Sequence, residues 1–212
     1  MKHLNFIKGS KTLLFYFLYV IVNGCNGQSK DLGNCKLHYR KATANINTYY
    51  QNKDTSLLKN ALGDVELSLE CPETKKASIE IKIGILSLLK EYSNAYRYID
   101  SLKDSDFKLK YKKMMDYNYF LALDRESKSD TIGRNKFIDS AKKIIQNYIN
   151  GESKFDEEAY YDLFYISSRS ESQQQIDKEI DILKKKYPSN GQFLDGIQST
   201  ISDTNKKSVS IN

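Results

Sequence analysis

The sequence predicts an all-α protein in which successive antiparallel helix hairpins stack against one another. Apolar side chains recur three to four residues apart along most of the chain, which is the spacing of one helix face. Only two prolines and ten glycines occur among 212 residues, a composition that disfavours a turn-rich β-sandwich. An apolar content of 40% and an aromatic content of 12% are sufficient for the hydrophobic core of one domain of ordinary size.

The segment from Ile79 to Leu102 is expected to be the centre of this array. Its apolar residues follow helical spacing on two faces of a first helix and along one stripe of a second, with a tight turn near Glu91–Asn94. A helix that is apolar on two sides packs between neighbours. Residues 79–85 also alternate apolar and polar, which is a strand pattern. We favour a helix because the apolar run continues through Leu89 without a turn signal.

The other helices follow from apolar stripes that are separated by polar, proline or glycine breaks. Pro72 suits the first turn of a helix, and Gly151 suits the end of one. Helices are expected at residues 36–51, 55–70, 107–124, 137–149, 157–167 and from 170 or 172 to 186, with a short capping helix near 193–201. Residues 125–135 are polar and contain glycine, so the longest surface loop is expected there. Residues 202–212 have little to bury and are expected to form a disordered tail.

The first 25 residues have the character of an export signal. Three lysines precede an apolar run at residues 13–22, which is too short to span a bilayer but fits the core of a secretory signal. The run ends in Val22-Asn23-Gly24-Cys25, which resembles the lipobox of bacterial lipoproteins, although Asn23 departs from the small or aliphatic residue usual there. The alternative is a plain signal peptide or a short membrane anchor in which Cys25 is incidental.

The lipobox resemblance implies a signal peptide at residues 1–24, lipidation of Cys25 and a tether at residues 25–34. It places the mature protein in the bacterial cell envelope, anchored by lipid on the periplasmic face of a membrane or at the cell surface. Cleavage before Cys25 leaves 188 of the 212 residues and removes three lysines and no acids, so the formal charge falls from +6 to +3. So small a net charge does not indicate a nucleic-acid partner.

Two cysteines remain after lipidation, and their placement predicts a disulfide. Cys35 lies just before the first expected helix and Cys71 just after the second, so both lie at the open end of one hairpin. An exported protein meets oxidising conditions, in which such a pair is expected to form a bridge. The alternatives are two free thiols or a metal site, but His38 is the only histidine of the mature chain, which leaves too few soft ligands for a metal.

The expected plan is four helix hairpins of about 35–45 residues, the signature of an α-helical repeat array. The spaced apolar and small positions resemble those of a tetratricopeptide repeat at Ile79, Ile83, Leu86, Tyr92, Ala95, Ile99 and Leu102, and again from Tyr160 to Pro188. The resemblance implies a short right-handed solenoid of stacked hairpins at residues 35–201. Ile83 and Ile176 stand where the family usually has small residues, so the repeats are degenerate. A non-repeating helical bundle is the alternative.

Residues that could carry catalysis are scarce in this sequence. There is no glycine-rich phosphate loop, and His38 is the only mature base for a nucleophile, near a helix start where capping or surface roles are commoner. Asp100, Asp104 and Asp106 are expected to lie at a solvated helix end rather than to bind a cation. The acids at 156–158 are expected to form the start of a helix. We therefore expect neither an enzyme nor a bound cofactor or metal.

The tyrosines are too numerous for one buried stripe, and tyrosine favours interfaces. We expect Tyr96, Arg97, Tyr119 and Tyr161 to bind a protein or peptide partner, as the tetratricopeptide resemblance also implies by analogy. The expected function is a lipid-anchored scaffold outside the cytoplasm. The alternatives are an immunity or inhibitor protein against a secreted toxin, and a glycan-handling accessory or enzyme.

Overall fold

The computed structural model describes residues 32–152 and 154–209, which belong to one compact unit. The expected signal peptide, the lipidation site Cys25 and tether residues 25–31 lie outside the described residues. So do residues 210–212 of the expected tail.

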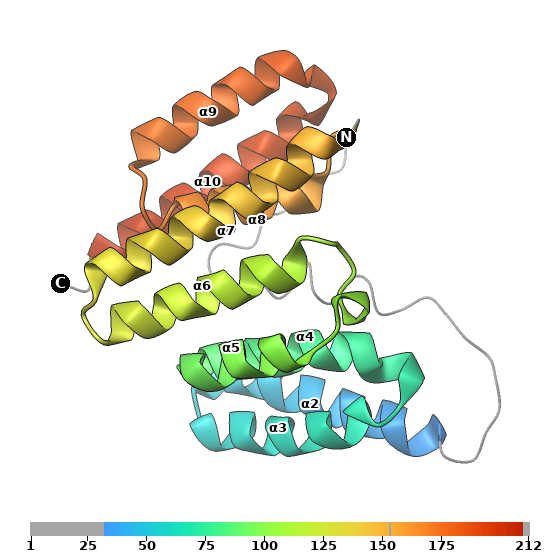
Figure 1. Cartoon of the computed structure of the whole chain (residues 1–212). Coiled ribbons are helices and arrows are strands. Elements are labelled where there is room, and N and C mark those ends of the chain that lie inside the picture. The colour runs from blue at the N-terminus through green and yellow to red at the C-terminus, as the bar shows by residue number, and fades with distance from the viewer. Residues whose placement is uncertain (1–31, 153, 210–212) are drawn as a thin grey trace. The chain divides into compact units, whose positions relative to one another are not determined.

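Every regular element among the described residues is helical (Figure 1). The α-helices are α2 (Leu32–Asn52), α3 (Thr55–Leu69), α4 (Pro72–Leu88), α5 (Tyr92–Ser101), α6 (Lys112–Ser127), α7 (Thr131–Gly151), α8 (Glu157–Ser167), α9 (Gln173–Lys186) and α10 (Gly191–Val209). Short 3₁₀ turns, η1 (Asp104–Asp106) and η2 (Pro188–Asn190), precede α6 and α10. From α2 to α8 each helix packs against the next, and α10 packs against both α9 and α8. The all-α prediction is confirmed.

The central pair of helices forms as predicted. Residues 79–85 lie inside α4, so the alternative of a strand there is wrong. Ile79 and Ile85 are both fully buried although six residues separate them, because α4 is covered on two sides by α3 and α5. Pro72 occupies the first turn of α4, where the missing N–H leaves no helical hydrogen bond unmade.

Three hairpin turns use the same unusual backbone conformation. Lys53, Lys90 and Ser129 follow α2, α4 and α6 and have φ values of 62°, 59° and 59°. After α4, the N–H of Glu91 donates to the carbonyl of Leu86 at 2.9 Å, and the turn after α6 contains the equivalent bond. This is the Schellman motif, in which a left-handed residue satisfies the last helix carbonyls. None of the three residues is glycine, so each turn has a conformational cost of about 1 kcal/mol.

Two predicted boundaries around α6 and α7 are wrong. Residues 125–135 do not form a long loop, because α6 continues to Ser127 and α7 begins at Thr131. The polar and glycine residues there form a helix start: the N–H of Gly133 donates to the Asp130 carboxylate at 2.8 Å. A Cβ atom at position 133 would collide with that carboxylate, so the cap itself requires glycine.

The predicted helix at residues 107–124 begins later in the structure. Residues 107–111 are irregular and place the side chains of Phe107 and Tyr111 in the core before α6 starts at Lys112. At the other end of the chain, α10 runs to Val209 and therefore continues past the expected start of the tail at residue 202.

Two groups of buried side chains in the hydrophobic core meet at α8, and further buried side chains, among them Leu58 and Val65, lie in the α2–α3 hairpin. Leu163 and Ile166 on one side of α8 belong to the larger group, and Tyr160 and Phe164 on the other side belong to the smaller. The larger group includes Ile79, Ile83, Leu86, Ala95, Ile99, Met115, Phe120, Leu123, Ile138, Ala141 and Ile145. The smaller includes Ile176, Ile180, Leu194, Ile197 and Ile201.

Cys35 and Cys71 form the predicted disulfide pair, with their Cα atoms 6.1 Å apart. Cys71 is the N-cap residue of α4. Cys35 lies in the first turn of α2, because that helix begins at Leu32, earlier than expected. The bridge therefore joins the amino-terminal ends of α2 and α4 across the α2–α3 hairpin.

We predict that the variant Cys35→Ala/Cys71→Ala unfolds at a lower urea concentration than the oxidised wild type. Closing a loop of this length removes conformational entropy from the unfolded chain, worth about 3–4 kcal/mol in the chain-entropy model. Reduced wild type is the matched control and should unfold with the double variant. Coincident urea curves for oxidised wild type and the double variant would contradict a stabilising bridge.

Candidate functional site

Helices α6 and α8 contact each other through a row of polar side chains, which we call the α6–α8 seam. It consists of Lys108, Lys112, Tyr119, Glu158, Asp162, Tyr165 and Arg169. The hydrogen-bonded pairs Lys108–Glu158 and Lys112–Asp162 are each 50 residues apart in sequence, and Tyr119–Tyr165 are 46 apart. So constant a separation means that α6 and α8 run parallel, side by side, with a fixed register.

The charged half of the seam centres on Asp162. One of its carboxylate oxygens accepts a hydrogen bond from Lys112 Nζ at 2.6 Å and another from the Tyr111 hydroxyl at 2.7 Å. Burial lowers the pKa of Lys112, but Asp162 and Asp116 more than offset that effect, so its pKa is raised. Lys112 therefore remains charged at every physiological pH.

Asp116 lies one helical turn beyond Lys112, and its carboxyl group has an unusually high pKa. It makes no hydrogen bond to another described residue, and burial raises its pKa to about 7. Lys112 opposes this shift, whereas the nearby carboxylates of Asp162, Glu80 and Glu158 add to it. The Asp116 side chain keeps partial contact with solvent although protein atoms surround it closely.

Helix α4 brings Glu80 to the same surface. Glu80 is exposed, but protein atoms packed around its carboxyl group and the Glu158 carboxylate raise its pKa, while Lys112 and Lys108 act in the opposite direction. We name the surface formed by α4, α6 and α8 around Glu80, Asp116 and Tyr161 the even-helix face. It is lined by ionisable and aromatic side chains from three separate helices.

The aromatic half of the seam is built on Tyr119. This side chain is 8% exposed, and its hydroxyl donates to the hydroxyl oxygen of Tyr165 at 3.2 Å. The same hydroxyl accepts a hydrogen bond from Arg169 Nη2 at 3.0 Å. The Arg169 guanidinium carbon lies 6.0 Å from the Tyr119 ring centre and 5.9 Å from that of Tyr165, within cation–π range. Burial raises the pKa of Tyr119 well above its usual value, so its phenol stays protonated.

The structure separates the four residues expected to bind a partner. Tyr119 and Tyr161 lie in one aromatic cluster, because the Tyr161 ring stacks parallel to that of Tyr165 with 6.4 Å between centres. Tyr96 instead packs edge-on against Tyr117, which projects about 200° around the α6 axis from Tyr119. Arg97 is exposed on α5.

Several residues of the site had not been singled out from the sequence: Glu80, Asp116, Asp162, Tyr165 and Arg169. The signal that would have identified them is the repeated separation of about 50 residues between complementary side chains. Recognising that separation requires the correct starts of α6 and α8. The sequence predicts the start of α6 at residue 107, whereas the helix begins at Lys112.

The remaining polar candidates have structural partners. The His38 ring nitrogen Nδ1 lies 2.7 Å from the Asp64 carboxylate and links α2 to α3. Asp106 accepts a hydrogen bond from Lys75, which with the backbone N–H of Lys103 lowers the pKa of that carboxyl. Asp156 caps α8 by accepting from the N–H of Ala159. Within residues 32–152 and 154–209, no three His, Cys, Asp or Glu side chains are placed to hold a metal ion.

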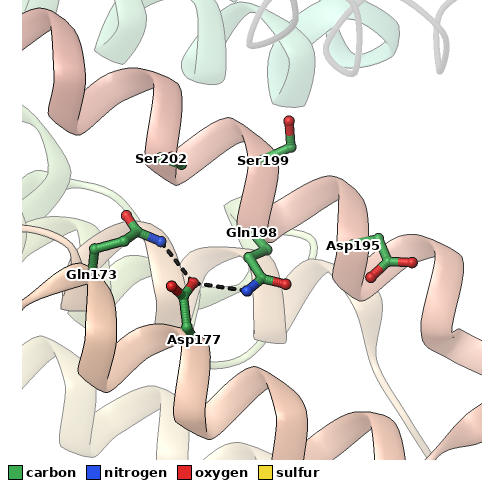
Figure 2. Close-up of a pocket in the computed structure, with 6 residues that line it drawn as sticks. All are labelled: Gln173, Asp177, Asp195, Gln198, Ser199 and Ser202. Atoms are coloured by element: carbon green, nitrogen blue, oxygen red, sulfur yellow. Dashed lines mark hydrogen bonds between the residues drawn. The ribbon is translucent and has the colours of Figure 1, made fainter.

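A shallow polar hollow lies between α9 and α10 (Figure 2). Its centre is the Asp177 carboxylate, which accepts hydrogen bonds from the side-chain amides of Gln173 and Gln198 at 2.8 and 2.9 Å. Figure 2 shows both amides pointing toward Asp177. The Gln198–Asp177 bond ties α10 to α9, and both amides are engaged by the carboxylate rather than free for a ligand.

Comparison of the chain with models of known families, with curated proteins and with solved structures finds no significant match. None of the helices in the described part of the chain combines the length and the apolar character that crossing a bilayer requires.

We predict that Asp116 makes stability fall as pH rises from about 4 to about 7. The folded protein retains a proton on Asp116 that the unfolded chain, with a pKa near 3.9, has already lost, so each pH unit lowers the unfolding free energy by up to about 1.4 kcal/mol. Urea unfolding of wild type and Asp116→Asn from pH 4 to 8 should show this contribution in wild type only.

Exposed Glu179→Gln is the matched control for the loss of one carboxylate, and its pH profile should run parallel to that of wild type. If the Asp116→Asn profile also stays parallel to that of wild type between pH 4 and 7, Asp116 has the same pKa in the folded and unfolded protein. That result would contradict a raised pKa in the folded state.

Proposed function

We propose that this chain is a lipid-anchored scaffold outside the cytoplasm that binds a protein or peptide along the even-helix face. The observation that carries the proposal is the side-by-side, parallel placement of α6 and α8, with α4 adding Glu80 to the same surface. A surface built from three successive hairpins is extended, and it suits an elongated ligand better than a compact one.

We further propose that the hairpins stack as a short, right-handed, tetratricopeptide-like solenoid. In such an array the first helices of successive hairpins lie parallel and line one face, which is the relation of α6 to α8. The recurrence of left-handed residues at Lys53, Lys90 and Ser129 supports repetition, because these residues follow the first helices α2, α4 and α6. Their spacings of 37 and 39 residues fall within the expected length of one hairpin.

The composition of the face supports binding. Half-buried Tyr161 and Tyr165 offer large contact areas at little cost in side-chain entropy. Glu80 and Lys108 are exposed, so their charges can select a partner by electrostatic complementarity. The acids and bases of the seam bond mainly to one another.

The partner-binding proposal is tested by photo-crosslinking in living cells. A photoreactive benzoylphenylalanine in place of Tyr161 or Glu80 should give a discrete adduct with a partner protein. The same residue at Leu67, which is exposed on α3 away from the face, is the matched control and should give none. Adducts of equal yield at Leu67 and Tyr161, or none at either face position, would rule out the even-helix face as the binding surface.

The anchoring proposal has its own test. Metabolic labelling with a radioactive fatty acid should mark wild type but not Cys25→Ala, because only the Cys25 sulfur receives the lipid. Membrane fractionation should release Cys25→Ala into the soluble fraction. Equal labelling of the two proteins would contradict lipidation at this cysteine.

A further inference from the structure

Arg169 differs from the other cations of the α6–α8 seam in having no carboxylate partner among the described residues. Lys108 pairs with Glu158 and Lys112 with Asp162, whereas the bonds of Arg169 go to phenol oxygen. The nearby acid Glu171 is engaged by Lys142. A permanent positive charge is therefore held at one end of the seam without a negative charge beside it.

The guanidinium is held in place by the two tyrosines. Tyr119 is buried in the core and accepts one of the five N–H groups of Arg169. The ring centres of Tyr119 and Tyr165 lie 6.0 Å and 5.9 Å from the guanidinium carbon and 5.9 Å from each other, so both rings are on the same side of the guanidinium. Arg169 itself is exposed, so its remaining N–H groups can reach a ligand. The positions of these donors are fixed before any ligand arrives, which reduces the entropy lost on binding.

Tyr165 supplies a further donor at the same place. Its oxygen accepts the hydrogen bond from Tyr119, so its own O–H hydrogen is not used in that bond. The neighbouring Tyr161 ring lies parallel to Tyr165, with an angle of 8° between planes. The two rings are therefore stacked, and the Tyr165 ring lies beside the guanidinium.

We propose that Arg169, together with Tyr165 and Tyr119, forms a subsite for a carboxylate group of an extended peptide. This inference rests on the proposed peptide-binding function and names one chemical feature of the ligand. The planar fork of a guanidinium matches a carboxylate in a bidentate geometry, and the Tyr165 hydroxyl adds a third donor. A single uncompensated positive charge matches one negative charge, and the stacked rings can pack against the peptide beside it. The carboxylate comes from an acidic side chain or from the chain end of the peptide.

The test follows the Arg169 Nε–H resonance of ¹⁵N-arginine-labelled, full-length protein in detergent micelles. The probe is an eight-residue glycine–serine peptide with blocked ends and one internal glutamate. It should shift the Arg169 resonance saturably, and the glutamine counterpart should not. Arg169→Gln should abolish the binding, and Tyr165→Phe should weaken it about threefold to tenfold, the effect of one hydrogen bond.

Exposed Arg40→Gln on α2 is the matched control, because it removes the same charge away from the seam and should bind the probe as wild type does. The glutamine peptide with a free carboxyl terminus distinguishes an acidic side chain from a chain end as the source of the carboxylate. If this peptide alone shifts the Arg169 resonance, the carboxylate belongs to a chain end. Three results would overturn the proposal. In the first, neither carboxylate peptide shifts the Arg169 resonance; in the second, only inorganic phosphate shifts it; in the third, Arg169→Gln binds the glutamate peptide as tightly as wild type does.

The subsite and the proposed function fail separately. If benzoylphenylalanine at position 161 crosslinks to a partner equally well with Arg169 and with Arg169→Gln, the even-helix face binds the partner but the carboxylate subsite is ruled out. If neither face position crosslinks to a partner but the glutamate peptide still shifts the Arg169 Nε–H resonance, the proposed partner-binding function is ruled out. The Arg169 subsite would still bind a carboxylate.

Discussion

The two hydrogen bonds to the Asp162 carboxylate set the register of the even-helix face. Lys112 and Tyr111 approach the same oxygen from α6, so α8 cannot slide along α6 without leaving a half-buried charge unpaired. Breaking such a pair from one side is costly, whereas the intact pair adds little net stability, and we infer that its main effect is on register. One consequence is seen two turns further along, where Tyr165 meets Tyr119 and Arg169 reaches the same hydroxyl.

Aliphatic packing supplies the stability within which this register operates. Ile99, Ile138 and Ile145 are all at most 1% exposed and come from α5 and α7, the two helices that pack against α6. The polar seam occupies what remains of the α6 surface. The left-handed residues Lys90 and Ser129 keep the α4–α5 and α6–α7 connections short.

Helical periodicity was sufficient to predict the helices, because burial of a regular stripe dominates over local composition. It identified α4 and α5, and the unbroken apolar run through Leu89 favoured a helix over a strand at residues 79–85. The positions of Cys35 and Cys71 predicted their bridge. Local composition failed at residues 125–135, where a glycine that serves the Asp130 cap was read as a loop signal. The site was harder, since Asp116 and Arg169 lack any local signature. Burial is the main cause of the raised pKa of Asp116, and Arg169 bonds to Tyr119, 50 residues away.

If the proposed lipid anchor holds the amino terminus, the bridge between Cys35 and Cys71 also has a mechanical consequence. A pull on that end reaches Cys35 in the first turn of α2 and passes through the covalent bond to Cys71 at the start of α4. The α2–α3 hairpin lies inside the closed loop and carries none of this tension. A load on the tether would therefore be transmitted directly to the central helices, and the first hairpin could not be peeled away on its own.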